Sequence, residues 1–302
     1  MSQKNTLITI VGATAIGKTA LSIKLAQHFN CDIISCDSRQ FYKEMSIGTA
    51  VPDSEELASA PHHFIQNRSV FEDYSVGQFE KDALKTLDEL FIKNPVQIMV
   101  GGSGLYVDAV LKGLDYFPDV DPKIRTNLTA ELENKGIVHL QNQLRELDIE
   151  AYNSIAIDNP HRLIRALEIC IGTGKTYSSF KNKPKAPRNF QSIKIGLKAD
   201  REIMYDRINR RVDIMIEKGL MEEAKKLHPH KSLNALQTVG YRELFDYFEG
   251  NFTKEFAIEE IKKNSRRFAK RQGTWFRKDS NILWFDFQED VQNIIKTIEN
   301  KL

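Results

Sequence analysis

The sequence predicts an α/β fold, a doubly wound parallel sheet interrupted by a helical insertion domain. Short apolar runs alternate with amphipathic helical patterns at both ends of the chain. Several of these runs are continuously apolar, which is typical of parallel strands covered on both faces. The middle of the chain lacks such runs, which indicates a separate helical segment. Alternating strands and helices favour the doubly wound architecture over a sandwich or a bundle.

Five segments are predicted as strands. They are Leu7–Val11, Ile33–Cys36, Val96–Val100, Ile193–Leu197 and Ile282–Phe287. A helix is predicted over Thr19–Phe29, where Leu21, Leu25 and Phe29 recur at helical spacing. Another is predicted after Tyr74, because Ser75 and Gln78 have the spacing of a capping box.

The segment from Asp115 to Arg188 contains no convincing strand pattern. Asp121-Pro122 opens a helical pattern, and further helix is predicted up to Ile171. Pro184 and Pro187 mark the return linker. We therefore expect an α/β core of residues 1–115 and 189–302, and a helical insertion domain of residues 116–188.

Composition excludes several classes of protein. The 302 residues include 41% hydrophobic and 28% charged residues, which is ordinary for a globular protein and excludes intrinsic disorder. The net charge of +2 gives no argument for a polyanionic partner. No apolar run is long enough for a membrane span, and the N-terminus lacks a signal peptide pattern. Three cysteines without a C-x-x-C pair favour the reducing cytoplasm and no zinc module.

The strongest motif follows the first predicted strand. It fits G-x-x-x-x-G-K-[ST] and consists of Gly12, Ala13, Thr14, Ala15, Ile16, Gly17, Lys18 and Thr19. Its backbone N–H groups and the following helix N-terminus would bind a diphosphate or nucleotide, as in P-loop NTPases. Lys18 would reach the terminal phosphates, and the Thr19 hydroxyl would bind Mg²⁺.

Two further polar groups are expected at the same edge of the sheet. The second strand is followed by Asp37, and the third by Gly101-Gly102-Ser103-Gly104. The carboxyl ends of parallel strands meet at the ligand crevice. Ser103 would therefore donate to the bound phosphate, or this segment would form only a tight structural turn. Asp37 would approach Mg²⁺ through water, accept a proton from a substrate, or cap a helix.

Eight segments, in order, resemble the tRNA dimethylallyltransferase family of the bacterial type. They are Gly12–Thr19, Asp37–Tyr42, Ile47–Ala50, Pro61–His63, Gly101–Tyr106, Asp158–Glu168, Val239–Glu243 and Ala269–Arg277. The resemblance covers about residues 6 to 278, nearly the whole chain. It departs from the family pattern at Ala13, where proline is usual, and at Ser103, where threonine is usual. Because serine keeps the hydroxyl, the inferred role of this position is retained.

The resemblance implies transfer of a dimethylallyl group from dimethylallyl diphosphate to N6 of the adenine 3′-adjacent to the anticodon of tRNA. Pyrophosphate is released. Asp37 resembles the family's general base, with an ordinary pKa of about 3.9, so we expect it to act late or to have its pKa raised by burial. Lys18, Ser103 and Mg²⁺ would stabilise the leaving diphosphate. Arg207 and Arg211, on one predicted helical face, would clamp it.

The distribution of charge predicts an RNA-binding surface. Residues 262–278 contain eight basic residues and no acidic residue, interleaved with Phe268, Trp275 and Phe276. The tRNA-binding residues that we predict are Asp37, Ser38, Arg39, Gln40, Ser103, Arg162, Arg165, Lys263, Arg267, Lys270 and Arg271. Gln40 would hold the target adenine, and Arg162 and Arg165 would contact the anticodon arm from the insertion.

Three other functions remain open at this stage. They are an isopentenyltransferase acting on free adenine nucleotides, a P-loop small-molecule kinase that binds ATP, and a non-enzymatic RNA-binding module. The basic segment and the insertion speak against the first, and the absence of a later strand-end Asp for Mg²⁺ speaks against the second. The third leaves the P-loop unexplained. We expect a cytoplasmic, monomeric transferase with tRNA and dimethylallyl diphosphate as partners, Mg²⁺ as cofactor and no membrane association.

Overall fold

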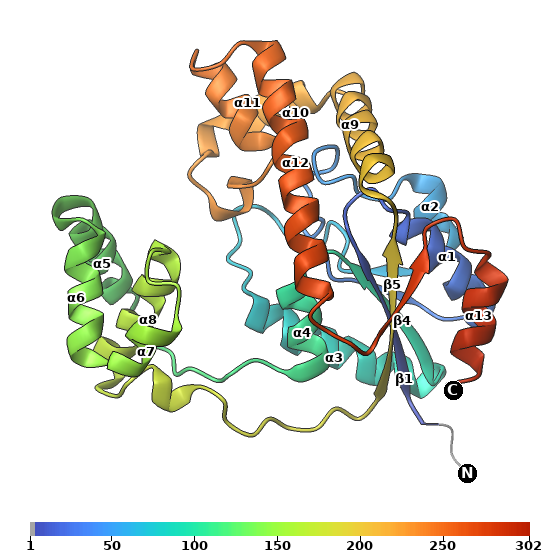
Figure 1. Ribbon diagram of the computed structural model, residues 1–302, viewed down its shortest axis with the longest axis horizontal. Coiled ribbons are helices and arrows are strands. Elements are labelled where there is room, and N and C mark those ends of the chain that lie inside the picture. Colours follow the sequence, from blue (N-terminus) through green and yellow to red (C-terminus); the bar gives the residue numbers. More distant parts are fainter. Residues whose placement is uncertain (1–3) are drawn as a thin grey trace. The chain divides into compact units, whose positions relative to one another are not determined.

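The computed structural model describes residues 4–302, and the chain alternates strands and helices (Figure 1). The first part contains β1 (Thr6–Gly12), α1 (Lys18–Phe29), β2 (Ile33–Ser35), α2 (Ser54–Ser59), β3 (His62–His63), α3 (Val76–Lys93), β4 (Val96–Gly101) and α4 (Gly104–Lys112). The middle contains α5 (Pro122–Lys135), α6 (Ile137–Leu147), α7 (Ile149–Ser154) and α8 (Pro160–Thr173). The last part contains β5 (Gln191–Lys198), α9 (Arg201–Glu217), α10 (Leu220–Leu227), α11 (Tyr241–Phe248), α12 (Lys254–Phe276), β6 (Ile282–Asp286) and α13 (Val291–Glu299).

The six strands form one parallel sheet in the order β3-β2-β4-β1-β5-β6. All five predicted strands are present, with small differences at their ends. The sequence reading missed β3, because a strand of two residues has no detectable periodicity. β3 is an edge strand, and its His63 Nε2 lies 2.8 Å from Asp32 Oδ2. The order reverses at β1, so the crevice of a doubly wound sheet lies at the carboxyl end of β1 and β4.

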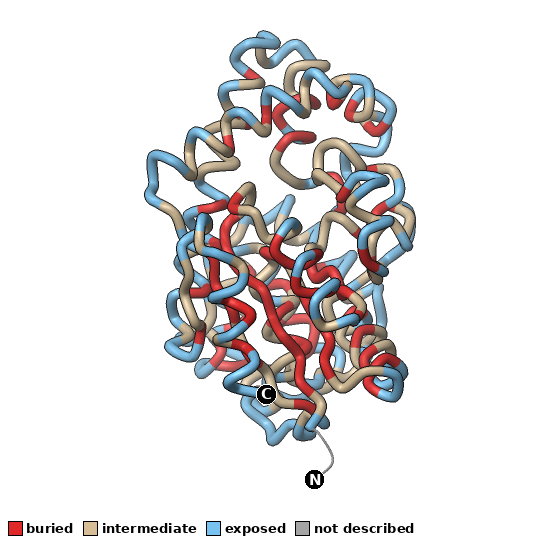
Figure 2. The backbone as a smooth tube through the Cα atoms, turned by 90° about the vertical axis from the view of Figure 1, so that its right-hand side faces the viewer, coloured by how far each residue is buried: buried red, intermediate tan, exposed pale blue. Residues whose placement is uncertain are grey.

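The sheet is covered on both faces. In β1, Ile8 and Ile10 pack into the core that contains α1 and α13, whereas Leu7 and Val11 pack into the core that contains α3 and α4. Figure 2 shows the resulting buried stretches of backbone. Burial of one aliphatic or aromatic side chain of this size contributes roughly 1.5–3 kcal/mol. The continuously apolar strands therefore fix the sheet between two helical layers.

Local signals define the helix ends that the sequence predicted. Ser75 and Gln78 form a reciprocal capping box at the start of α3. Asp121 caps α5 by accepting from the backbone of Lys123.

No helix within residues 4–302 combines the length and apolar character that a membrane crossing requires.

The chain forms two compact units. The larger contains residues up to Lys112 together with Arg188–Leu302, and the smaller is Gly113–Pro187. The sequence reading put these boundaries at 115/116 and 188/189. The smaller unit is entirely helical and has its own core between α5, α6 and α8.

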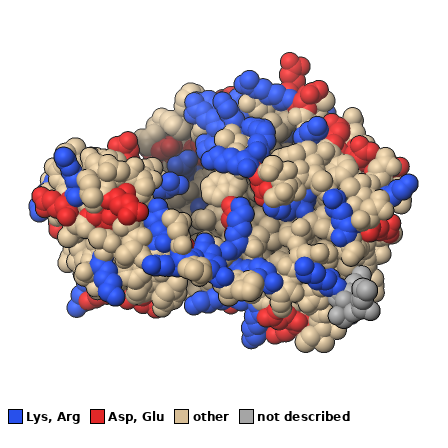
Figure 3. All heavy atoms as spheres, turned by 60° about the horizontal axis from the view of Figure 1, so that its bottom comes forward, with Lys and Arg blue, Asp and Glu red and all other residues tan. Residues whose placement is uncertain are grey.

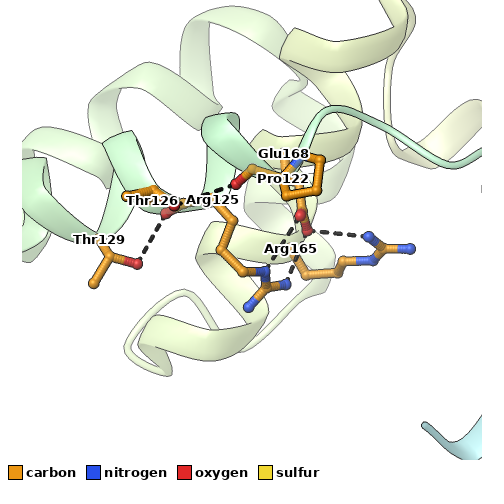
Figure 4. Close-up of polar contacts among 6 residues, drawn as sticks. All are labelled: Pro122, Arg125, Thr126, Thr129, Arg165 and Glu168. Carbon is orange, nitrogen blue, oxygen red and sulfur yellow. Dashed lines mark hydrogen bonds and ion pairs between the residues drawn. The ribbon is translucent and has the colours of Figure 1, made fainter. Parts of the chain in front are cut away.

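One buried carboxylate organises the smaller unit. Glu168 on α8 accepts two hydrogen bonds from Arg125 of α5, at 3.2 and 2.8 Å, and one from Arg165 at 3.0 Å (Figure 4). Burial alone raises the pKa of Glu168, but the two guanidinium groups hold it below its ordinary value. Glu168 therefore ties α5 to α8 as an ionised group, and Arg165 is fixed by this contact.

Candidate active site

The P-loop lies at the carboxyl end of β1, where the strand order reverses. Gly12 has φ +149°, and a Cβ there would lie 3.0 Å from the carbonyl oxygen of Leu197. Gly17 has φ +109°, which L side chains rarely adopt. These two glycines allow the turn that the motif predicted. Lys18 opens α1, and its Nζ donates to the Ala13 carbonyl at 2.7 Å.

Two partly buried cations, Lys18 and Arg211, lie beside this loop. Burial lowers the pKa of Lys18 to about 8, and the negative charge of Asp37 partly opposes that shift. Burial also lowers the pKa of Arg211 on α9, with Asp37 and Glu56 acting in the opposite direction. An anion bound here would relieve the cost of burying both cations.

Asp37 follows β2 and lies at the crevice. Its Oδ1 accepts from the backbone N–H of Arg39 at 3.2 Å, and the other carboxylate oxygen is not used in the described contacts. Ser103, at the turn after β4, lies beside it: Ser103 Oγ accepts from the Ser38 backbone at 3.2 Å and lies 3.2 Å from Ser38 Oγ. The ends of β2 and β4 are thus joined by the residues that the sequence singled out.

A cavity of about 470 Å³ opens at this point. The predicted site residues that line it are Thr14, Asp37, Ser38, Arg39, Ser103, Arg211 and Arg271. Trp275 and Phe268 of α12 also line it. The cavity therefore combines a carboxylate, hydroxyls, cations and aromatic rings in one place.

Two predicted residues have structural partners instead of facing this cavity. The Gln40 amide donates to the carbonyls of Thr49 and Ala50, at 3.3 and 3.0 Å, and accepts from Ser35. Arg207 donates to the carbonyl of Ala15 at 2.8 Å, so it supports the P-loop from behind.

Sequence reasoning missed Gln272, which is buried between two loops. Its Oε1 accepts from the Thr14 backbone at 2.9 Å, and its Nε2 donates to the Gly102 carbonyl at 3.0 Å. A Cβ at Gly102 would collide with this amide. Gln272 lies within the segment Ala269–Arg277 that resembles the family, but nothing in the sequence assigned a role to this side chain.

The basic residues of α12 differ in their surroundings. Lys263 is ion-paired with Glu260, and Arg267 donates to Asn264 at 3.3 Å. Lys270 is exposed, and Arg271 extends over the ring of Phe268. Lys and Arg side chains gather in patches on the face shown in Figure 3. Arg162 and Arg165 belong to the smaller unit, where Arg162 is exposed.

The sequence profile of the IPP transferase family matches residues 40–279, most of this chain. The chain belongs to the IPP transferase family. The tRNA dimethylallyltransferase of Flavobacterium psychrophilum is 62% identical over 304 residues and covers 99% of both chains. The tRNA dimethylallyltransferase of Christiangramia forsetii is 63% identical over 298 residues, with the same coverage. The family predicted from the eight motifs is therefore confirmed.

Solved structures of this family have the same fold. The tRNA isopentenylpyrophosphate transferase of Bacillus halodurans gives a TM-score of 0.71 at 40% identity, over 98% of this chain and 95% of that one. A eukaryotic dimethylallyltransferase acting on tRNA gives 0.80 at 27% identity, over 98% of this chain and 80% of that one. The predicted P-loop NTPase-like α/β fold is thus confirmed.

The structure explains two of the segments that resembled this family. The Glu223 carboxylate accepts from the backbones of Ser46, Ile47 and Gly48, and from the Tyr241 hydroxyl at 2.6 Å. A Cβ at Gly48 would lie 2.6 Å from that hydroxyl. The segment around Ile47 and the segment around Tyr241 are therefore packed together as one wall of the cavity.

The Thr19 hydroxyl and the Asp37 carboxylate beside the P-loop are compatible with a Mg²⁺ ion that is held mainly by the phosphates of a bound substrate. No cluster of three or more His, Cys, Asp or Glu side chains within residues 4–302 is arranged to hold a metal. The Thr19 hydroxyl is free of hydrogen bonds to other described residues, and Asp37 has an unused carboxylate oxygen. Mg²⁺ in proteins usually keeps several waters and binds one or two side chains together with substrate phosphates.

Proposed function

We propose that this protein transfers a dimethylallyl group from dimethylallyl diphosphate to N6 of the adenine next to the anticodon of tRNA. The observation that carries the proposal is the position of Asp37 in one cavity with Thr14, Ser103 and Arg211, beside the partly buried Lys18. The groups that would bind the diphosphate and the carboxylate that would accept the adenine proton therefore lie in one cavity, where the two substrates would meet.

The leaving diphosphate would bind to the P-loop backbone and to the two partly buried cations. As the bond between C1 of the dimethylallyl group and the diphosphate oxygen breaks, the electron pair leaves with the diphosphate. Lys18 and Arg211 would stabilise this developing charge, because preorganised charges are most effective in a site with little water. The Ser103 hydroxyl would add one hydrogen bond.

Asp37 would accept the proton of the adenine amine. The new bond joins N6 to C1, and the amine must lose one proton to regain a neutral product. The Arg39 backbone N–H orients one carboxylate oxygen of Asp37, which leaves the other for this transfer. The target base must leave its loop to enter the cavity, as in other enzymes that modify bases.

Mg²⁺ would be held by Thr19 and the diphosphate, where it would supply positive charge to the leaving group.

Exposed cations of α12, with Arg162 in the smaller unit, would contact RNA phosphates. We expect the protein to act as a monomer. We expect the protein to act in the cytoplasm, where its tRNA substrate is found.

The decisive experiment supplies labelled dimethylallyl diphosphate and Mg²⁺ with unmodified tRNA, AMP or adenosine. The proposal predicts label on N6 of adenosine after the RNA is digested to nucleosides. Label in AMP without label in RNA would instead identify a nucleotide isopentenyltransferase. Phosphate transfer from ATP, with no prenyl transfer to any acceptor, would identify a kinase.

An Asp37→Asn variant tests the role of the carboxylate. The amide keeps the oxygen that accepts from Arg39 but cannot take the proton. We expect transfer to fall about 10²–10⁴-fold while the protein still binds dimethylallyl diphosphate. The exposed Asp73→Asn serves as the matched control. Equal loss of binding and transfer in Asp37→Asn would show that the carboxylate is structural.

A further inference from the structure

A second cavity of about 590 Å³ lies in the larger unit, between α9, α12, the P-loop, the carboxyl end of β5 and the middle of β6. Its walls are largely apolar and include Leu197, Met204 and Trp284. Its volume falls in the range of cavities that hold small organic ligands, about 300–1,000 Å³. Ala13 and Ile16 of the P-loop and Lys270 of α12 also line this cavity, whereas Asp37, Ser103 and Arg211 do not.

The second cavity is separate from the active site. The two share no lining residue. Between them, Ala13, Ile208 and Ala269 pack into a small apolar cluster. Ile208 lines the active-site cavity, whereas Ala13 and Ala269 line the second one. A ligand in the second cavity would therefore touch the P-loop from its reverse side without meeting Asp37.

Four cationic side chains line the second cavity, and no acidic side chain of residues 4–302 lines it. The cations are Lys198, Arg201, Lys270 and Arg277. Within residues 4–302 none of the four forms an ion pair, although many other basic residues of the protein do. Arg201 extends over the Tyr205 ring, 5.1 Å from its centroid. All four are exposed, so their charges face solvent and are not paired with a carboxylate among the described residues.

We propose that this cavity binds a small organic phosphate ester with an apolar body. These exposed guanidinium and ammonium groups would hold the phosphate, since arginine binds phosphate oxygens in a bidentate manner. The aliphatic and aromatic walls would remove the organic body from water, at roughly 25 cal/mol for each Å² of apolar surface buried. The proposal does not depend on the prenyl transfer reaction.

Two kinds of ligand have this chemistry and can be tested in parallel. One is an isoprenoid diphosphate longer than dimethylallyl diphosphate, and the other is a nucleotide. The probes are labelled geranyl diphosphate and labelled ADP, with inorganic diphosphate as a probe that lacks an organic body. Each is measured by equilibrium dialysis against the full chain. Because the P-loop also binds diphosphates, the number of bound molecules per chain is the primary result.

Two sets of variants separate the sites. Lys18→Met with Arg211→Met disables the P-loop site. Lys198→Gln with Arg201→Gln removes two cations of the second cavity. The Ala199→Phe variant fills that cavity without changing its charge. Lys24→Gln with Lys85→Gln, at exposed positions on α1 and α3, is the charge-matched control, and thermal unfolding verifies that each variant is folded.

We expect wild type to bind two molecules of geranyl diphosphate or of ADP, and the P-loop variant to retain one. Added to the P-loop variant, either change in the second cavity should weaken the remaining binding at least tenfold, and the control should not. A preference for geranyl diphosphate would identify an isoprenoid ligand, and a preference for ADP a nucleotide. The proposal is wrong if wild type binds one molecule, if the P-loop variant binds none, or if inorganic diphosphate binds as tightly as both esters.

Discussion

The Oε1 atom of Gln272 accepts a hydrogen bond from the backbone N–H of Thr14 at 2.9 Å, although 258 positions separate the two residues. The same amide donates to the carbonyl of Gly102. One side chain of α12 thus fixes the P-loop and the turn after β4 relative to each other. The helix that carries the basic residues is therefore joined directly to the diphosphate site.

Replacing Gln272 should destabilise this connection. Gln272→Met keeps the approximate volume but leaves the Thr14 N–H and the buried Gly102 carbonyl without partners. Each unsatisfied buried group costs about 1–3 kcal/mol, so we expect urea unfolding to show a loss in this range or above. Gln292→Met, at an exposed position on α13, should change stability little. Equal stability of the two variants would show that the Gln272 hydrogen bonds contribute nothing net.

The charge of Lys18 should make substrate binding dependent on pH. Since burial lowers its pKa to about 8, Lys18 is charged at pH 7 and loses its proton as pH rises through about 8. Affinity for dimethylallyl diphosphate, measured by equilibrium dialysis, should therefore fall above pH 8 and approach a tenfold loss per pH unit. Lys18→Met should bind weakly at pH 7 and lack this dependence, whereas Lys24→Met should behave as wild type. An unchanged affinity of wild type from pH 7 to 9.5 would contradict the assignment.

The exposed cations of α12 should contribute to RNA affinity through phosphate contacts. The Lys270→Ala/Arg271→Ala variant should bind tRNA more weakly, with a shallower dependence of log K on log salt. Each lost phosphate contact should change that slope by about 0.7–0.9. The control, Lys81→Ala/Lys85→Ala, removes two exposed cations from α3. A slope equal to that of wild type would exclude these α12 residues from the RNA interface.

Glu168 should stabilise the smaller unit. Glu168→Gln leaves Arg125 and Arg165 without an anionic partner, at an expected cost of about 1–3 kcal/mol, moderated because both arginines are partly exposed. Hydrogen exchange of the amides of α5 and α8 should speed up accordingly. The pKa of Glu168 is below its ordinary value of 4.5, so its contribution is complete above pH 4.5 and is lost as pH falls below it. Similar exchange in Glu168→Gln and in the exposed Glu133→Gln would rule out this role.

Most of the fold could be predicted because its signals are local. The strand at Leu7–Val11 is predicted by a run of consecutive residues that suits burial on both faces, and the structure buries all of them. The capping box of Ser75 and Gln78 likewise involves residues of one helical turn. The P-loop is equally local, since Gly12 and Gly17 adopt conformations that few other residues tolerate. A strand as short as β3 carries no such signal, because it is held only by its pairing with β2.

The sequence by itself determined the sheet, the phosphate-binding turn and the family, because each depends on neighbouring residues or on motifs in order. Tertiary structure alone decided how the remaining polar groups are used. It placed the Gln40 amide on the backbone of Thr49 and Ala50, and inserted Gln272 between the P-loop and Gly102. It also left Arg201 without an acidic partner among the residues that the structure describes. Such contacts join residues far apart in the chain, and only the packing of helices on the sheet determines which polar groups meet.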